Sequence, residues 1–190
     1  MRYDIVLAGV GGQGVLSMAA LIGRAAFAEG LTVQQSEVHG MAQRGATVQA
    51  HLRIADAPIH SPLISRGGAD LILSLEPVEA LRHLPWLAPS GMLVTAAEAV
   101  VNAPDYPPHD DLIRRVHALP SSIVVEAERL AEAAGDQLAV NTVMVGAASH
   151  RLPLRIESLQ AAIRQTFAHK GERTLAINLA AFAAGREAAS

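Results

Sequence analysis

Short apolar runs alternate with longer amphipathic stretches over the first two thirds of the chain. Five apolar runs have the length and composition of buried strands, at residues 4–8, 31–36, 70–75, 92–95 and 123–125. Four stretches with apolar residues three or four positions apart predict helices, at residues 13–29, 76–85, 112–119 and 126–134. This alternation is typical of βαβ units, and we expect the first two strands to form a parallel pair joined by a right-handed crossover.

Two further patterns complete the predicted fold. Apolar and polar residues alternate over residues 47–54, which predicts a strand with one solvated face towards a sheet edge. Three helices are predicted from the helical period of the C-terminal part, at residues 140–152, 156–169 and 174–188. We therefore expect an α/β fold in a single domain of residues 1–190. It should be a Rossmann-like three-layer α/β/α sandwich, with a mostly parallel sheet, a possible antiparallel edge and the C-terminal helices packed on it.

A glycine-rich turn follows the first predicted strand. Gly9, Gly11 and Gly14 have the spacing G-x-G-x-x-G, which allows a tight turn, close backbone approach to a ligand and close packing of helix on strand. Gly12 adds a fourth glycine, and Gln13 offers a side-chain amide. The N-terminus of the following helix favours an anion such as a pyrophosphate. The spacing alone is equally consistent with a tight turn that binds nothing.

A polar segment at residues 36–45 follows the second predicted strand. Ligands of open α/β sheets bind at the carboxyl ends of the strands, so this segment and the glycine turn should share one edge of the sheet. Its candidate binding residues are Ser36, Glu37, His39, Gly40, Gln43, Arg44 and Gly45. Glu37 lies 23 residues after Gly14, near the position of the ribose-binding acid of dinucleotide enzymes. A solvated loop, with a cap or turn role for Glu37, is the simpler alternative.

The composition excludes several classes of protein. The chain has 190 residues and no cysteine, which excludes disulfides, a thiolate nucleophile and iron–sulfur clusters ligated by this chain. Its formal net charge of −3 and aromatic content of 3% supply neither the basic nor the stacking surface of a nucleic-acid-binding protein. No apolar run approaches the ~20 residues of a membrane-spanning helix, and no export signal is recognisable, so we expect a cytoplasmic protein.

The histidines and two asparagines invite functional interpretation. His39, His51 and His60 have neither the spacing nor the company of metal ligands, so no metal site is expected. The other five histidines are expected at the surface, namely His83, His109, His117, His150 and His169. Asn141 is expected to cap a late helix, whereas Asn178 has no assigned role.

The chain resembles the gamma module of the 2-oxoacid:ferredoxin oxidoreductases over nearly its whole length. Two motifs carry the resemblance, Gly9-Val10-Gly11-Gly12-Gln13-Gly14 and Ser36-Glu37-Val38-His39-Gly40-Met41-Ala42-Gln43-Arg44-Gly45. Further matching positions are 53–54, 59–64, 68–72, 75–77, 141–146, Asn178, Phe182 and Gly185. The form Ser-Glu-Val-His-Gly-Met is most similar to the indolepyruvate branch of the family, in its small subunit, usually called beta. Ala46 departs from the family pattern, which commonly has a second glycine there.

The resemblance implies one subunit of a hetero-oligomeric enzyme that is inactive alone. In such an enzyme a large alpha subunit binds thiamine diphosphate, Mg and the iron–sulfur clusters. It decarboxylates an aryl-2-oxoacid, passes electrons to ferredoxin and delivers the acyl group to coenzyme A. This chain also lacks the Gly-Asp-Gly…Asn pattern of thiamine enzymes, so no catalytic residue is expected on it. A coenzyme A pyrophosphate suits the glycine turn. A free-standing NAD(P)-dependent dehydrogenase and a non-catalytic nucleotide-binding or scaffold module stay open as alternatives.

Overall fold

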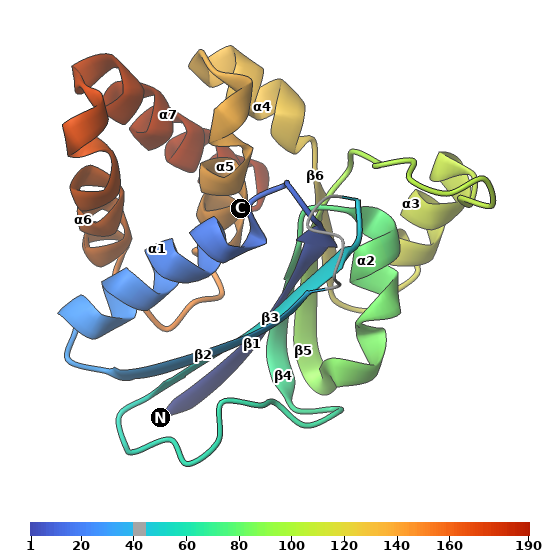
Figure 1. The fold of residues 1–190 in the computed structure, drawn as a ribbon, viewed down its shortest axis with the longest axis horizontal. Coiled ribbons are helices and arrows are strands. Elements are labelled where there is room, and N and C mark those ends of the chain that lie inside the picture. Colours follow the sequence, from blue (N-terminus) through green and yellow to red (C-terminus); the bar gives the residue numbers. More distant parts are fainter. Residues whose placement is uncertain (40–44) are drawn as a thin grey trace.

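A six-stranded sheet forms the centre of the molecule, with helices on both of its faces (Figure 1). We describe a computed structural model, which covers residues 1–39 and 45–190. The strands are β1 (Arg2–Val10), β2 (Thr32–His39), β3 (Thr47–Ala55), β4 (Ala69–Ser74), β5 (Leu87–Ala96) and β6 (Ser122–Val125). The helices are α1 (Val15–Ala28), α2 (Pro77–Arg82), α3 (His109–His117), α4 (Ala127–Ala134), α5 (Val140–Ala148), α6 (Ile156–Phe167) and α7 (Glu172–Ala188). These elements confirm the α/β class and lie close to the predicted ranges.

The strand order contradicts one prediction, namely that the first two strands form a parallel pair. The sheet has the order β2-β3-β1-β4-β5-β6, and β3 runs antiparallel to both of its neighbours. The strands β1 and β2 therefore point the same way, but β3 lies between them and they do not pair. Consecutive strands joined by a short connection pair antiparallel, and here β3 follows β2 in this way before it pairs with β1. The rest of the sheet is parallel.

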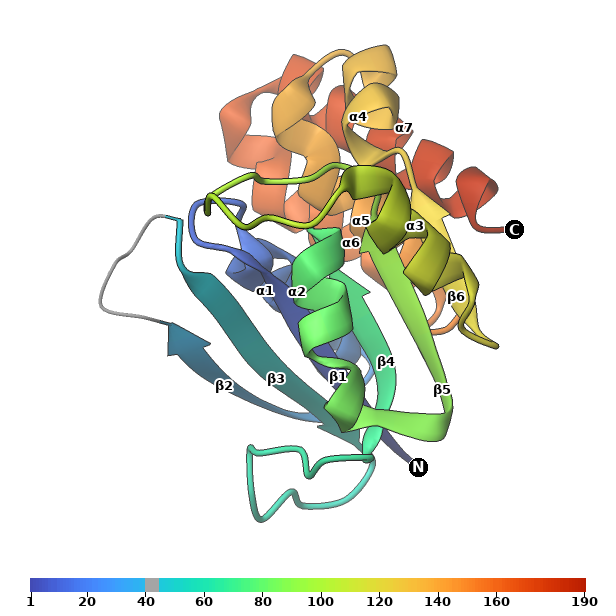
Figure 2. The same cartoon turned by 90° about the vertical axis from the view of Figure 1, so that its right-hand side faces the viewer.

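The sheet is buried between two layers of helices, as expected for a three-layer sandwich. The strand β1 shows this directly, because Ile5, Val6 and Leu7 are all fully buried although successive side chains point to opposite faces. Ile5 and Leu7 belong to a cluster with residues of α1 and of α4 to α7, whereas Val6 packs with residues of α2 and α3. Figure 2 shows the same layers from the side. In the part of the chain described here, no helix is long and apolar enough to cross a membrane.

The C-terminal helices α5 and α7 approach each other closely through glycine. A Cβ atom built on Gly185 would lie 1.9 Å from the carbonyl oxygen of Val143, and one built on Gly146 would lie 2.1 Å from that of Phe182. Asn178 lies in the same interface, where it accepts a hydrogen bond of 2.6 Å from the Thr142 hydroxyl. The late asparagine without an assigned role is thus part of the helix interface.

The polar face of β3 is covered by protein rather than solvated, which corrects the sequence-based expectation. Arg53 donates to both carboxylate oxygens of Asp4, at 2.9 and 3.0 Å. It also donates to the carbonyl oxygens of Ser61 and Leu63, at 2.8 and 3.1 Å. Residues 56–68, between β3 and β4, therefore lie over this face, and alternation in the sequence did not distinguish burial under a loop from exposure to water.

Candidate functional site

The glycine turn between β1 and α1 lies at the carboxyl edge of the sheet. Gly14 precedes the first residue of α1 with φ +83°, a left-handed conformation that favours glycine. A Cβ there would also lie 2.4 Å from the Asn141 side-chain nitrogen. Gly9 is needed for packing, since its Cβ would lie 2.8 Å from Val15 Cγ2. Two of the four glycines are therefore explained by the architecture of the turn itself.

Gln13 uses both ends of its amide inside the protein. Its side-chain oxygen accepts from the Val10 N–H at 2.7 Å, and its side-chain nitrogen donates to the Leu75 carbonyl oxygen at 3.0 Å. The side chain therefore joins the end of β1 to the residue that follows β4. Among the sequence-predicted binding residues, Gln13 has the clearest structural task.

We expect Gln13→Leu to lower the free energy of unfolding by about 1–2 kcal/mol, because two partly buried hydrogen bonds are lost together. Urea denaturation of the purified variant measures this loss. Gln165→Leu, at an exposed position of α6, is the matched control and should stay within about 0.5 kcal/mol of wild type. Equal midpoints for the two variants would contradict the bridging role.

The structure brings Gly45 to the glycine turn. The Gly11 N–H donates to the Ala46 carbonyl oxygen at 2.7 Å, and the Gly45 N–H donates to the Gly11 carbonyl oxygen at 3.2 Å. These bonds continue the pairing of β1 with β3 beyond its last partners, Val10 and Thr47. The two sequence motifs therefore meet at one edge of the sheet, as the βα pattern predicted.

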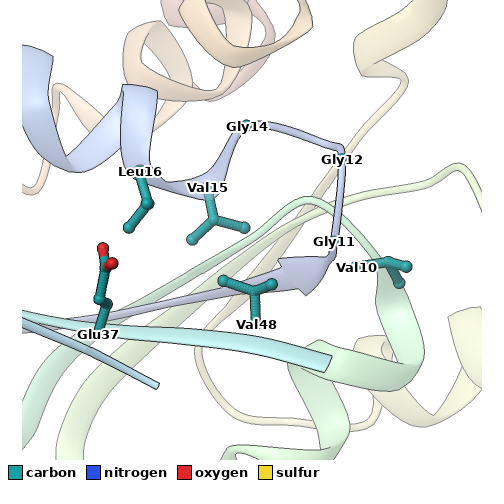
Figure 3. A pocket seen from close by; sticks show the side chains of 8 residues that line it. All are labelled: Val10, Gly11, Gly12, Gly14, Val15, Leu16, Glu37 and Val48. Carbon is teal, nitrogen blue, oxygen red and sulfur yellow. The ribbon is translucent and has the colours of Figure 1, made fainter. Parts of the chain in front are cut away.

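A pocket of about 340 Å³ opens beside the turn (Figure 3). Its lining residues are Val10, Gly11, Gly12, Gly14, Val15, Leu16, Glu37 and Val48. Glu37 comes from β2 and points toward Leu16 of α1, whereas the other side chains are apolar. The pocket thus combines apolar walls, the amino end of a helix and one carboxylate from the polar segment.

Ser36, the other candidate binding residue of the polar segment whose side chain is described, does not line this pocket. Ser36 neighbours Glu37 in β2, so the two side chains point to opposite faces of the sheet. Ser36 pairs in register with His51, on the face opposite to α1. His39 is the last residue of β2, and Gly40, Gln43 and Arg44 lie outside the described residues. The structure therefore brings together five glycine-turn residues, Glu37 and Gly45.

Glu76 and Tyr106 form a second polar cluster at the same edge, which sequence reasoning missed. Glu76 is 1% exposed, and its carboxylate accepts hydrogen bonds from the Glu79 N–H at 2.7 Å and from the Tyr106 hydroxyl. Burial raises the pKa of the Glu76 carboxyl, and burial together with Glu76 raises the pKa of Tyr106. The sequence marked Glu76-Pro77 as the start of a helix. The available signal for its contact with Tyr106 was the presence of a tyrosine in a proline-rich connection.

The cap role predicted for Asn141 and the surface position predicted for His83 are both wrong. Asn141 does not cap α5, because it is the second residue of that helix and the cap position is held by Ala139, without a side-chain cap hydrogen bond. Asn141 instead lies against Gly14, and its side-chain oxygen is buried with no partner among the described residues. His83 is 3% exposed rather than at the surface, packed beside Trp86. Within residues 1–39 and 45–190, no three histidine or acidic side chains are grouped to hold a metal ion.

His51 is buried and should make stability depend on pH. Its Nδ1 accepts from the Ile64 N–H at 2.8 Å. Burial lowers the pKa of His51, His83 and Arg53 lower it further, and Asp4 acts in the opposite direction. Below the unfolded-state value of about 6.5, the unfolded chain therefore binds a proton that the folded chain does not. The free energy of unfolding should fall as the pH drops below that value.

Thermal unfolding between about pH 5 and pH 7.5 tests this dependence. The fluorescence of Trp86, the only tryptophan, reports unfolding, and its ring centre lies 6.4 Å from that of His51. His51→Gln should flatten the fall in Tm at the acid end, whereas His169→Gln, at an exposed position, should leave it unchanged. A His51→Gln variant with the wild-type pH profile would show that this histidine is not the group responsible.

A family model and a known protein both match most of this chain. The family model described as pyruvate ferredoxin/flavodoxin oxidoreductase matches residues 4–188. The chain is 40% identical, over 179 residues, to the indolepyruvate oxidoreductase subunit IorB of Archaeoglobus fulgidus, covering 90% of this chain and 88% of that protein.

Two solved structures share the fold at low sequence identity. The gamma subunit of a keto/oxoacid ferredoxin oxidoreductase from Geobacter sulfurreducens is 22% identical with a TM-score of 0.71, and 98% of each chain is covered. A 2-oxoglutarate:ferredoxin oxidoreductase from Magnetococcus marinus, solved with 2-oxoglutarate, coenzyme A and succinyl-CoA bound, is 20% identical with a TM-score of 0.78. The match covers 99% of this chain but only 31% of that larger one.

Proposed function

This chain belongs to the pyruvate ferredoxin/flavodoxin oxidoreductase family, and we propose that it is the small subunit of an indolepyruvate-type 2-oxoacid:ferredoxin oxidoreductase. The observation that carries the proposal is its 40% identity, over most of both chains, to an indolepyruvate oxidoreductase subunit. The complex would convert an aryl-2-oxoacid to its acyl-CoA and pass electrons to ferredoxin. A large alpha subunit would bind thiamine diphosphate, Mg and the iron–sulfur clusters. Iron–sulfur clusters are held by cysteine thiolates, and this chain has no cysteine.

Coenzyme A is the ligand that we assign to the carboxyl edge of this chain. The pocket of about 340 Å³ has apolar walls that suit part of the pantetheine arm. The first turn of α1 starts beside it at Val15 and Leu16, and N–H groups of a first turn have no partners within their helix, which favours a phosphate. Of the sequence-predicted set Gly9, Gly11, Gly12, Gln13, Gly14, Ser36, Glu37, His39, Gly40, Gln43, Arg44 and Gly45, we propose all as binding residues except Ser36, which faces the other side of the sheet. In this set Gly9 and Gln13 shape the turn.

The sheet order does not favour a free-standing NAD-dependent dehydrogenase. In dinucleotide-binding folds the ribose-binding acid follows the strand that lies next to β1. Here Glu37 belongs to β2, and β3 separates that strand from β1. The carboxylate is therefore one strand spacing, about 4.8 Å, farther from the glycine turn than in that arrangement.

Reconstitution tests the proposed function. The full chain and the large subunit encoded by the same cell should each be inactive alone and should together reduce ferredoxin with indolepyruvate and coenzyme A. Thiamine performs the carbanion chemistry, which no side chain of this subunit supplies. Ferredoxin reduction by the purified chain alone, or no activity from the reconstituted pair, would refute the proposal.

The Gly11→Ala variant distinguishes a role of Gly11 in ligand binding from a role in the architecture of the turn. Gly11 does not have the positive φ of Gly12 and Gly14, so alanine there carries no left-handed backbone strain. We expect the KM for coenzyme A in the complex to rise about tenfold, with the free energy of unfolding changed by less than about 1 kcal/mol. Gly12→Ala is the comparator, because its φ of 104° should cost about 1 kcal/mol of stability. An unchanged KM for Gly11→Ala would remove coenzyme A from this turn.

A further inference from the structure

The connection between β5 and α3, residues 97–108, lies over the carboxyl edge of the sheet (yellow-green in Figure 2). We call it the strap. Its Tyr106 hydroxyl donates to the Glu76 carboxylate, and its Asn102 side-chain nitrogen donates to the Gly45 carbonyl oxygen at 2.8 Å. At the end of the strap, His109 Nε2 lies 2.7 Å from the Ala97 carbonyl oxygen. The strap is therefore tied both to the start of α2 and to the polar segment.

Glu76 is a fixed anchor for the strap. One carboxylate oxygen accepts from the Glu79 N–H at 2.7 Å and so caps α2, while the other accepts from Tyr106. The Ser74 hydroxyl donates to the Glu76 carbonyl oxygen at 2.7 Å, which holds the backbone as well. A buried carboxylate with these partners has little freedom to move, so the tyrosine that binds it is fixed in turn.

The contacts of the strap close a ring around the glycine turn. Asn102 holds Gly45, and Gly45 and Ala46 exchange hydrogen bonds with Gly11. Within the same turn, Gln13 donates to the Leu75 carbonyl oxygen at 3.0 Å, and Leu75 adjoins the anchor Glu76. The path therefore runs from the strap to the glycine turn, on to the end of β4, and back to the strap through Tyr106.

We propose that Tyr106 and Asn102 are positioning residues that hold Gly45 and the glycine turn in the geometry that binds coenzyme A. The proposal rests on the function proposed above. Without the Asn102 donor, the hydrogen bond that remains to Gly45 among residues 1–39 and 45–190 is the one from its N–H to the Gly11 carbonyl oxygen. Without the Tyr106 hydroxyl, the strap loses its tie to Glu76 and the ring is open at the opposite side.

Three variants of the strap test the proposal in the reconstituted complex. Asn102→Asp removes the donor at an exposed position, and Tyr106→Phe removes only the hydroxyl; Asp105→Asn, exposed in the same strap, is the matched control. We expect each positioning variant to raise the KM for coenzyme A about 5- to 10-fold with kcat within about twofold of wild type. The double variant should show no more than the larger single effect, because both changes open one ring. Asp105→Asn should match wild type.

Hydrogen exchange and Tm distinguish positioning from loss of stability. The amide of Gly11, bonded to Ala46, should exchange faster in Asn102→Asp while the Tm stays close to wild type. Unchanged KM and exchange in Asn102→Asp, or a KM that rises only with a lowered Tm, would overturn the proposal. An active wild-type complex whose KM responds to Gly11→Ala but to neither strap variant refutes the strap alone. An inactive complex refutes the proposed function and the strap proposal with it. An active complex that does not respond to Gly11→Ala refutes the coenzyme A site at the glycine turn, and with it the strap proposal.

Discussion

Gly185→Ala should lower the free energy of unfolding by about 3 kcal/mol, which corresponds to about 6–12 °C in Tm for a domain of this size. The added methyl carbon would lie 1.9 Å from the backbone oxygen of Val143, so α7 must move away from α5 or the interface must distort. The obstacle is backbone rather than the end of a flexible side chain. Rotation of a side chain therefore cannot relieve the clash, and α5 and α7 would lose packing along their length.

Gly23→Ala is the control for this prediction. It makes the same chemical change within a helix, but its added carbon meets Val33 Cγ1 and Leu52 Cδ1 at ordinary contact distances of 3.4 and 3.8 Å. Alanine is a better helix former than glycine by up to about 1 kcal/mol, so the variant should be neutral or slightly stabilised. Thermal melts of the two variants beside wild type give the comparison. A Gly185→Ala protein that melts with wild type would show that the two helices do not approach as closely as described.

The strands and helices that could be predicted from the sequence are those with a local pattern of apolar and polar residues. Strands such as β1 and β4 have continuous apolar runs because both of their faces are buried, and α1 has a regular apolar stripe. The position of β3 between β1 and β2 was not predictable in this way. Strand order depends on pairing between segments that are far apart in the sequence. The residues of β2 do not indicate which strand pairs with it.

The candidate site was predicted as a location more successfully than as a set of contacts. The rule for carboxyl edges correctly placed Gly45 and Glu37 beside the glycine turn. It did not reveal that Gln13 is engaged within the protein, or that Tyr106 binds Glu76. Those contacts join residues far apart in the sequence, and each partner alone has an ordinary local role, as a turn residue or a helix cap.

Arg53→Met should lower the free energy of unfolding by about 3–5 kcal/mol. The substitution keeps a long apolar stem but leaves the carboxylate of Asp4, whose side chain is only 2% exposed, without the guanidinium that donates to both of its oxygens. Arg2 also approaches Asp4, at 3.3 Å, but its side chain is 66% exposed and a solvated partner compensates much less. The cost arises from the buried charge left behind more than from the pair that is lost.

Two companion variants make the cause of that loss measurable. Arg24→Met, at an exposed position of α1, controls for the change of residue type and should stay within about 0.5 kcal/mol of wild type. Asp4→Asn combined with Arg53→Met removes the stranded charge, so it should recover more than half of the stability lost in the single variant. Arg53 also ties the carbonyl oxygens of Ser61 and Leu63, so trypsin should cleave after Arg66 faster in both Arg53 variants. Equal instability of the single and double variants would assign the loss to the covering connection rather than to the buried carboxylate.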